Sequence, residues 1–220
     1  MKTIPARWHG GNQTPTLVVI HATVSPTKKG GAVATANFFH TETAETSAHR
    51  VVDPGEIVKC LDDDVIAYHC GYNTGSLGLE LCIYPLLGSM GNWLKPKSKR
   101  GKVKQHAKMT PLTWLRPSVR KMMRLAAGQV ADWCIVHDIP VRFLGPAKLA
   151  TWDQRGRPAH LGGITTHAHM SDTFHASTHW DPGAWPRARF MRMVSTAYAA
   201  KTAPKKTKQT AKKTPTKKKA

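Results

Sequence analysis

The sequence predicts one α/β domain followed by a basic tail, and three observations carry this prediction. Leu17 to Ile20 form a short unbroken apolar run, which is typical of a buried strand. Residues 48–60 hold two β-rich runs around a turn, as in a hairpin. Residues 118–137 carry apolar side chains largely on one face of a helix. A chain of 220 residues can bury a sizeable core in one such domain.

The N-terminal part predicts short elements separated by turns. Residues 1–15 are rich in Gly, Pro and Asn and predict an irregular lead-in, and residues 32–39 show roughly helical spacing of Ala, Val and Phe. Asp53-Pro54-Gly55 separates the two runs of the hairpin. The three aspartates at 62–64 open a short apolar stretch, so they predict a solvated helix start rather than a metal cluster.

The next predicted strand contains an acidic residue. The turn at 73–76 leads into residues 77–83, which are apolar except for Glu80. A buried carboxylate is costly unless it is paired or has a chemical task. Glu80 is therefore a candidate functional residue.

The middle of the chain combines a basic segment with the longest predicted helix. Residues 95–108 hold seven Lys and Arg and no acid, and predict an exposed loop that is either simply solvated or contacts an anionic polymer. The helix at 118–137 is expected to begin with Ser118 as its cap and to use its Met and Trp residues as core. Residues 139–143 predict at most a short edge strand, because proline removes a ladder donor. Residues 151–163 predict a polar loop.

The C-terminal end predicts a closing helix and a tail. Residues 186–199 present an apolar face and begin with Pro186, which suits a first helical turn. From Lys201 onward only Lys, Thr, Ala, Pro and Gln occur, a composition that cannot bury a core. We therefore expect a folded domain over residues 1–200 and a disordered Lys-rich tail over residues 201–220.

The charge balance predicts an anionic partner. The chain has 33 Lys and Arg against 13 Asp and Glu, a net charge of +20. Nine of these charges are tail lysines, which leaves +11 for residues 1–200. Such a field favours nucleic acid, anionic lipid or other anionic polymers. No helix-turn-helix or zinc-finger spacing occurs, and the basic residues are not interleaved with stacking aromatics, so we expect no specific nucleic-acid binding.

Cysteine usage and the N-terminus predict a protein that starts in the cytoplasm. The four cysteines form no CxxC pair, and we expect free thiols rather than two disulfides. Lys2 is not followed by an apolar segment, so no secretory signal peptide is predicted. No apolar run approaches the length of a membrane span.

A His-rich stretch in the last third is a candidate metal site. It gathers several imidazoles and one carboxylate before a Pro-Gly turn: His167, His169, His175, His179 and Asp181. His21 ends the predicted strand, where α/β sheets often place functional side chains. Catalytic zinc typically has three protein ligands and one open position. From the residues alone, several imidazoles compete to be ligands.

The order of several motifs resembles the zinc-dependent N-acetylmuramoyl-L-alanine amidases of type 2, which share their fold with peptidoglycan recognition proteins. The resemblance spans most of residues 15–195. It rests on Val-Val-Ile-His-Ala-Thr at the first strand and on four further segments, namely residues 47–55, 68–71, 73–80 and 163–183. Ser-Thr-His-Trp-Asp-Pro-Gly at 177–183 looks most like amidase modules of phage endolysins, especially those of actinobacterial phages.

The resemblance implies a role for each candidate residue. The positions that match the zinc ligands are His21, His167 and Asp181. Glu80 matches the general base, and His69 matches a residue of the substrate cleft. His179 falls where many relatives carry a lysine that stabilises the oxyanion, and an imidazole N–H can donate the same hydrogen bond. His169 lies two residues from His167, and we assign the ligand role to His167. His49 matches a position that is usually structural.

The resemblance also implies a fold, a reaction and partners. We expect a central mixed β-sheet flanked by helices, and zinc-dependent cleavage of the bond between N-acetylmuramic acid and L-alanine in peptidoglycan. As a phage endolysin, the chain would act as a monomer, wait in the host cytoplasm and reach the wall through a holin-made hole. The tail would bind anionic wall polymers or membrane. The alternatives are a non-catalytic peptidoglycan-binding module, a cytoplasmic wall-recycling amidase and a sequence-blind nucleic-acid binder.

Overall fold

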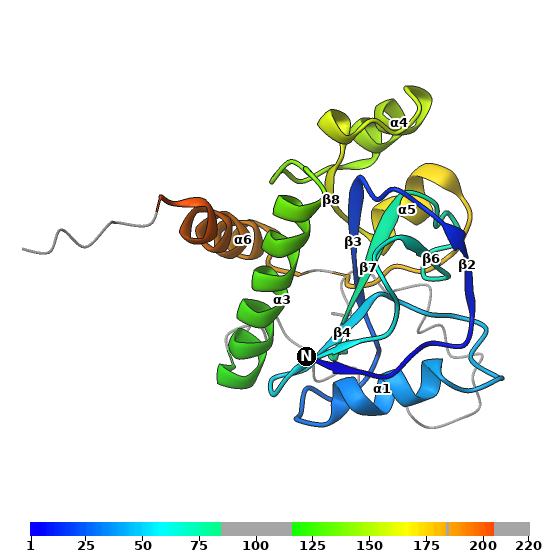
Figure 1. Cartoon of the computed structure of the whole chain (residues 1–220), viewed down its shortest axis with the longest axis vertical. Coiled ribbons are helices and arrows are strands. Elements are labelled where there is room, and N and C mark those ends of the chain that lie inside the picture. The colour runs from blue at the N-terminus through cyan, green and yellow to red at the C-terminus, as the bar shows by residue number, and fades with distance from the viewer. Residues whose placement is uncertain (85–115, 184, 205–220) are drawn as a thin grey trace, which may run out of the picture.

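The fold is built on a six-stranded sheet in the order β1-β5-β4-β7-β3-β8 (Figure 1). The computed structural model describes residues 1–84, 116–183 and 185–204. The strands of this sheet are β1 (Lys2–Thr3), β3 (Leu17–Ala22), β4 (Arg50–Val52), β5 (Ile57–Lys59), β7 (Ser76–Leu81) and β8 (Gly163–Thr166). A second, two-stranded sheet pairs β2 (His9–Asn12) with β6 (Val65–Ala67).

The sheet is mixed, as expected. β3 pairs in parallel with β7 on one side and with β8 on the other, and β4 also pairs in parallel with β7. The predicted hairpin is present, because β4 and β5 are antiparallel. Every residue of β3 is buried, which is typical of a parallel strand covered on both faces.

Helices cover both faces of the sheet. They are α1 (Gly31–Phe39), α3 (Pro117–Val136), α4 (Pro146–Gln154), α5 (His167–Phe174) and α6 (Arg187–Thr202), with a 3₁₀ turn η3 (Ala159–Leu161). Val18 and Ile20 pack into the large core shared with α1, α3 and α6. Leu17 and Val19 pack into a smaller core with α4 and α5. This alternation is the period of two expected of a strand, and it decides which face each side chain of β3 joins.

The predicted helices α1, α3 and α6 are confirmed, with two differences at their ends. Arg116 is the N-cap of α3 and makes no side-chain cap hydrogen bond, so the predicted cap at Ser118 is wrong. Pro117 already occupies the first turn, which its fixed backbone angle suits. α6 runs on to Thr202, and the ammonium of Lys201 lies 2.5 Å from the Asp132 carboxylate. Two residues assigned to the tail therefore belong to this helix.

Three other sequence predictions are wrong. The irregular lead-in predicted for residues 1–15 contains the short strands β1 and β2. No helix follows the aspartates at 62–64; the chain enters β6, and Asp63 accepts hydrogen bonds from Arg50 and from the Trp133 ring. The apolar stretch there is too short for a helix and instead pairs with β2. The predicted loop at 151–163 begins inside α4, whose two buried residues are too few to give a helical pattern.

The remaining expectations have mixed outcomes. Phe143 makes only an isolated bridge to Ile164, which agrees with at most a short edge strand. All four cysteines are free and buried, as predicted. None of the helices in the described ranges is long and apolar enough to cross a membrane. The basic segment at 95–108 and residues 205–220 of the tail lie outside the described residues.

Candidate metal centre and active site

Strand register brings His21 and Glu80 together. His21 follows Leu17 and Val19 on the face of β3 that looks toward α5. In the parallel pair of β3 and β7, His21 stands opposite Glu80. Directly paired residues project to the same face, so the two side chains are neighbours. The Glu80 Oε1 lies 4.0 Å from the His21 Nδ1.

β8 brings His167 to the other side of His21. Thr166 pairs with Ile20, so the next residue, His167, lies beside His21 as α5 begins. Thr166 caps this helix by accepting a hydrogen bond from the backbone N–H of His169. The Nδ1 atoms of His21 and His167 are 3.1 Å apart.

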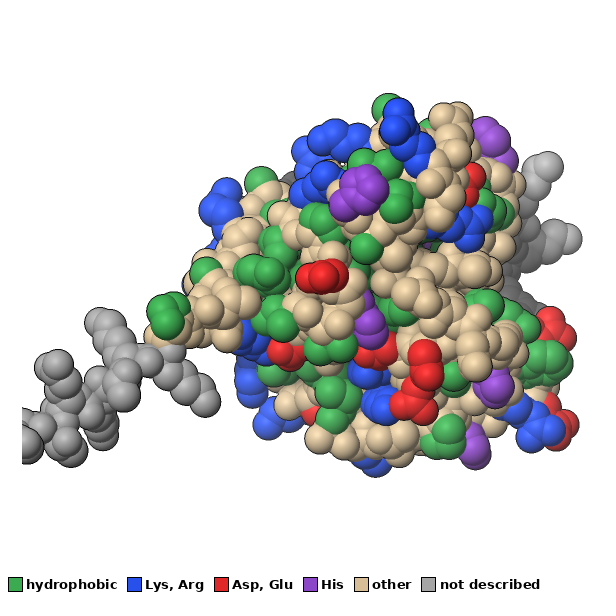
Figure 2. Space-filling view, turned by 45° about the horizontal axis from the view of Figure 1, so that its top comes forward, with side chains coloured by type: hydrophobic (Ala, Val, Ile, Leu, Met, Phe, Trp, Pro, Cys, Tyr) green, Lys and Arg blue, Asp and Glu red, His purple; other side chains and the backbone are tan. Residues whose placement is uncertain are grey.

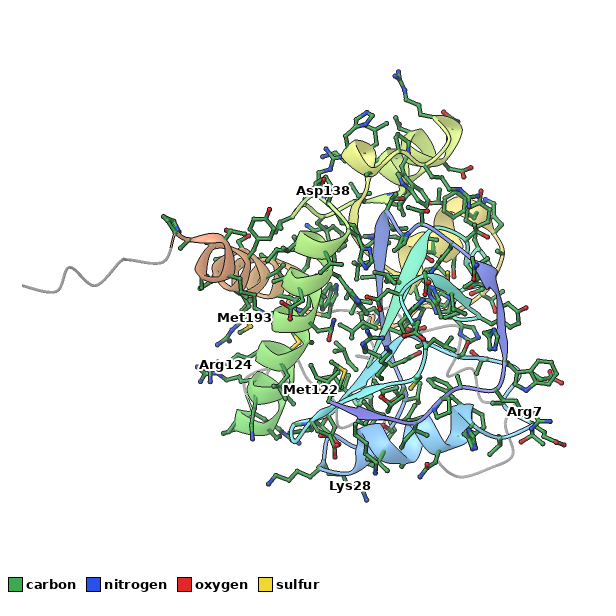
Figure 3. All side chains as sticks on the ribbon, viewed as in Figure 1. Arg7, Lys28, Met122, Arg124, Asp138 and Met193 are labelled. Atoms are coloured by element: carbon green, nitrogen blue, oxygen red, sulfur yellow. The ribbon has the colours of Figure 1, made fainter. Side chains whose placement is uncertain are left out.

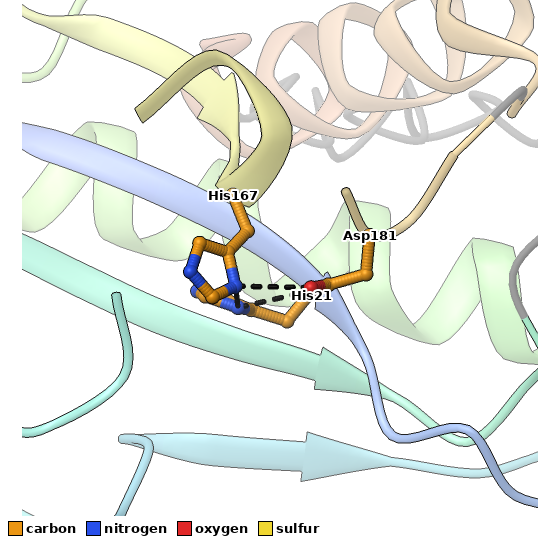
Figure 4. A group of neighbouring side chains, drawn as sticks. All are labelled: His21, His167 and Asp181. Atoms are coloured by element: carbon orange, nitrogen blue, oxygen red, sulfur yellow. Dashed lines mark hydrogen bonds and ion pairs between the residues drawn. The ribbon is translucent and has the colours of Figure 1, made fainter. Parts of the chain in front are cut away.

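Asp181 completes the group from the loop after α5. Its carboxylate accepts a hydrogen bond from the backbone N–H of Ala22 at 3.0 Å, and its backbone carbonyl accepts one from Ala168 at 3.0 Å. The carboxylate oxygens then lie 3.0 Å from the His167 Nδ1 and 3.4 Å from the His21 Nδ1 (Figure 4). The loop therefore holds the carboxylate against both imidazoles.

This group fits a divalent metal. The candidate ligand atoms of His21, His167 and Asp181 all lie within 4.8 Å of one another, and all three residues are buried. Only one of the two facing Nδ1 atoms can carry a hydrogen in their contact, so at least one lone pair points into the group. Two imidazoles and a carboxylate form a donor set that catalytic zinc uses, with a fourth position left for water or substrate.

Hydrogen bonds behind the imidazoles hold both rings in place. The His21 Nε2 lies 2.9 Å from the His69 Nδ1, and the His167 Nε2 lies 3.0 Å from the Ser177 hydroxyl. Such outer partners orient ligand rings and select the nitrogen that faces a metal. Ser177 was not singled out in the sequence, because a hydroxyl ten residues from its partner gives no sequence signal.

Burial and neighbouring groups favour the ligand-competent protonation states of His21 and Asp181. Burial lowers the pKa of His21 from 6.5 to about 4, so its imidazole is neutral at pH 7. Burial alone would raise the pKa of Asp181, but the neighbouring imidazoles of His167 and His21 lower it overall. A neutral imidazole and an ionised carboxylate are the forms that bind metal.

Glu80 is a buried carboxyl group beside the three candidate ligands. Its side chain is 14% exposed, and its Oε2 has no hydrogen-bond partner among the described residues. Burial, and then the charge of Asp181, raise the pKa of Glu80 well above its ordinary value. A carboxyl group with a raised pKa in a cavity is suited to both accepting and donating a proton.

A cavity of about 240 Å³ opens over these residues. Its lining includes the whole group: His21, His69, Glu80, His167, His179 and Asp181. His179 is at the exposed rim with its ring centroid 4.9 Å from that of His167, and burial lowers its pKa. The six residues to which the resemblance assigns a metal, catalytic or substrate role therefore line one cavity.

Three further histidines lie outside the metal group. His169 packs its ring 5.3 Å from that of Phe143 and lines a different groove, so of the two neighbouring imidazoles the structure brings His167 to the group. His69 lies behind His21 and also contacts the Ser76 hydroxyl at 3.0 Å. His49 is fully buried and accepts a hydrogen bond from the backbone N–H of Gly78, which is a structural role.

The sheet and this site define an α/β-class protein with a candidate metal centre in its main cavity. The chain belongs to the N-acetylmuramoyl-L-alanine amidase family, whose model matches residues 11–184. It is therefore an N-acetylmuramoyl-L-alanine amidase, an enzyme that hydrolyses peptidoglycan. The family expected from the sequence motifs is confirmed. No curated protein sequence matches the chain.

Solved structures share the fold at low sequence identity. The Staphylococcus aureus hydrolase AmiA in complex with its ligand has a TM-score of 0.58 at 13% identity, with 91% of this chain and 83% of that chain covered. A mutant of PlyL has a TM-score of 0.53 at 12% identity, covering 89% and 98%. A mutant endolysin from Bacillus subtilis has a TM-score of 0.50 at 16% identity, covering 88% and 97%. At these identities the likeness concerns the fold.

Proposed function

We propose that the enzyme is zinc-dependent and cleaves the amide bond between the lactyl group of N-acetylmuramic acid and L-alanine. The observation that carries this proposal is the convergence of His21, His167 and Asp181 at one point, with Glu80 beside them in the same cavity. The three ligand candidates would hold the ion, which when bound supplies Lewis acidity that polarises a carbonyl and acidifies water.

In this mechanism Glu80 moves the protons. Its carboxylate accepts a proton from the attacking water and then donates it to the departing amine of L-alanine. The raised pKa of Glu80 supports both steps, because the protonated form must persist between them. The carboxyl group also lies within the cavity, where bulk water is partly excluded.

His179 and His69 have supporting roles in the proposed reaction. From the rim, His179 donates an N–H hydrogen bond to the oxygen that becomes negative during attack, and losing such a donor typically costs roughly 10²–10³ in rate. His69 lines the substrate cavity, as the resemblance implies, and its contact with the His21 Nε2 also orients that ring.

Digestion of purified peptidoglycan tests the reaction and the metal together. Mass spectrometry should find free lactyl groups and new L-alanine amino termini, and metal analysis should find zinc in wild type but not in His167→Ala. A zinc-loaded protein that binds peptidoglycan without releasing either product would refute the mechanism and favour a binding role.

We propose further that the enzyme is a phage endolysin that lyses its host. The net charge of +20, the Lys-rich C-terminal segment and the motif at 177–183 support a lytic role at an anionic cell wall. The enzyme would stay in the host cytoplasm as a monomer and leave through a holin-made hole. Expression in a bacterial host should cause lysis only when a holin is co-expressed. Equal survival with and without the holin would refute this and favour a cytoplasmic recycling enzyme.

We assign the tail a role in holding the enzyme on anionic wall polymers or membrane. Lys201 pairs with Asp132 inside α6, so the truncation that spares the fold removes residues 205–220, which contain eight lysines. It should slow lysis of whole cells, most strongly at low salt, and leave hydrolysis of a soluble muropeptide unchanged. A full-length control with these lysines replaced by glutamine should behave like the truncation. Equal loss on both substrates would contradict the role.

A further inference from the structure

A second groove lies next to the catalytic cavity. Its volume is about 700 Å³, and it runs along the start of α6 and past Phe143 and His169. Trp180 is 36% exposed and lines both spaces, so the two spaces meet at this residue. Because Trp180 directly precedes the metal-ligand candidate Asp181, the groove begins beside the reacting centre.

The floor of the groove is a packed set of rings. The ring centroids of Phe143 and His169 are 5.3 Å apart, and those of Phe143 and Trp185 are 6.5 Å apart. Trp185 in turn packs 4.9 Å from Phe190, which is fully buried in the main core. The floor is thus anchored to the core of the domain and gives an extended ligand a fixed surface.

The rim of the groove is cationic. Arg187, Arg189 and Arg192 line it from α6, and the guanidinium of Arg187 lies 4.9 Å from the Phe143 ring centroid. Within the described ranges, none of these three arginines has an ion-pair partner, and Asp172 is the acid that lines the groove. Figure 2 shows one face of the molecule, on which Lys and Arg side chains lie mostly toward the edge and several Asp and Glu side chains lie nearer the centre. The groove therefore favours an anion that can lie along aromatic rings.

We propose that this groove binds the carboxylate-bearing peptide stem of the substrate. The inference rests on the proposed function, since it places the scissile amide at the group of His21, His167 and Asp181. A cavity of about 240 Å³ holds only the surroundings of that bond, so the rest of the substrate must leave it. The neutral glycan has no anionic group that could form an ion pair with arginine. The peptide stem carries carboxylates, and a guanidinium group can donate two parallel hydrogen bonds to a carboxylate.

Arginine variants and a pair of substrates test the assignment. The variants are Arg187→Gln and Arg192→Gln, with Arg124→Gln as the matched control. Arg124 is an exposed arginine on α3 beside Met193 and outside this groove (Figure 3). The substrates are two soluble N-acetylmuramoyl peptides that differ only in whether the stem carboxylates are free or converted to carboxamides. The two groove variants should raise KM for the free-carboxylate substrate about tenfold, the loss of one charged hydrogen bond, with kcat unchanged.

Both controls should keep wild-type kinetics. The carboxamide substrate should show the same KM with wild type and with the groove variants, and Arg124→Gln should behave as wild type on both substrates. Equal KM increases on both substrates, an equal effect of Arg124→Gln, or no change in any variant would overturn the proposal. Inorganic polyphosphate and the free stem peptide are also compared as competitive inhibitors. If polyphosphate inhibits wild type more strongly than the stem peptide does, and the groove variants lose this inhibition, the proposal is overturned and the groove binds a phosphate polymer instead.

Calorimetry separates this inference from the proposed function. The free-carboxylate stem peptide, without its muramoyl group, should bind metal-free wild type and bind the groove variants more weakly. If zinc-loaded wild type cleaves neither substrate, the proposed reaction fails while the calorimetric comparison still decides the groove. If cleavage proceeds and the stem binds all variants equally, the groove assignment fails alone.

Discussion

Replacing Glu80 with glutamine tests the proposed proton transfer directly. The side chain is largely buried, its Oε2 lacks a partner among the described residues, and its Oε1 lies 4.0 Å from the His21 Nδ1. Glutamine has nearly the same shape but has no proton to exchange with water or amine. Glu80 is not one of the three grouped ligand candidates, so the variant should keep its metal.

The expected loss follows from the two steps that Glu80 serves. Removing a general acid–base group typically costs 10²–10⁴ in rate, which corresponds to about 2.7–5.4 kcal/mol of activation free energy. We expect the upper half of this range, because the same carboxyl group acts in both attack and departure. KM should not change, since the lost interaction exists only in the transition state.

Folding should not suffer in the Glu80→Gln variant. Burial raises the pKa of Glu80, which means that the protein environment disfavours its ionised form. Glutamine removes that cost, so the metal-free variant should melt at or above the temperature of metal-free wild type. Activity and stability are therefore expected to move in opposite directions.

The assay is hydrolysis of a soluble N-acetylmuramoyl peptide, followed by the release of L-alanine amino groups, with zinc content measured on the same samples. Glu56→Gln, a substitution in the hairpin away from the cavity, is the matched control and should keep wild-type kcat. A loss of less than tenfold in kcat with zinc bound would refute the assignment of Glu80 as the proton carrier.

Three other predictions concern histidines. Zinc at about 100 times its Kd should stabilise wild type by about 2.7 kcal/mol, which corresponds to a rise in Tm of roughly 5–10 °C. The His169→Ala variant should show the same rise in Tm, and the His167→Ala variant should show none. A rise in Tm in both variants would contradict the ligand set. Burial lowers the pKa of His49 from 6.5 to about 4. The neutral His49 ring therefore contributes fully to folding stability above pH 6.5, and this contribution declines as the pH falls toward 4. Urea unfolding of the metal-free proteins measures this effect. Between pH 8 and pH 4, the free energy of unfolding should fall by up to about 3 kcal/mol more in wild type than in His49→Gln. An equal dependence of the unfolding free energy on pH in the two proteins would refute this. His179→Ala should lower kcat roughly 10²–10³-fold, with partial recovery in His179→Lys, and an unchanged kcat would exclude the donor role.

Elements with a strong local pattern were predictable from the sequence. In three elements the spacing of apolar residues indicates which face is buried. These are the strand before His21, the hairpin around Asp53 and the helix α3. Elements with weak patterns were missed. α4 buries only two residues, and β6 is a three-residue strand that exists because β2 is available to pair with it.

Composition supplied the right chemical groups for the candidate site, while the choice between the neighbouring imidazoles came from the family resemblance, which assigned the ligand role to His167. Both His167 and His169 are imidazoles near a carboxylate, and composition treats them alike. The turn of α5 separates them, since residues two apart on a helix face different sides. One therefore meets His21, and the other meets Phe143.

By itself, the sequence determined the local elements, the basic charge and the residue types that can perform hydrolysis, because these depend on neighbouring residues. The tertiary structure alone decided that His21 meets a histidine 146 residues away and a carboxylate on another strand. Parallel pairing on both sides of β3 sets those distances, and strand register is a relation between distant segments that no local pattern contains. The groove beyond Trp180 arises in the same way, from α6 closing over residues far earlier in the chain.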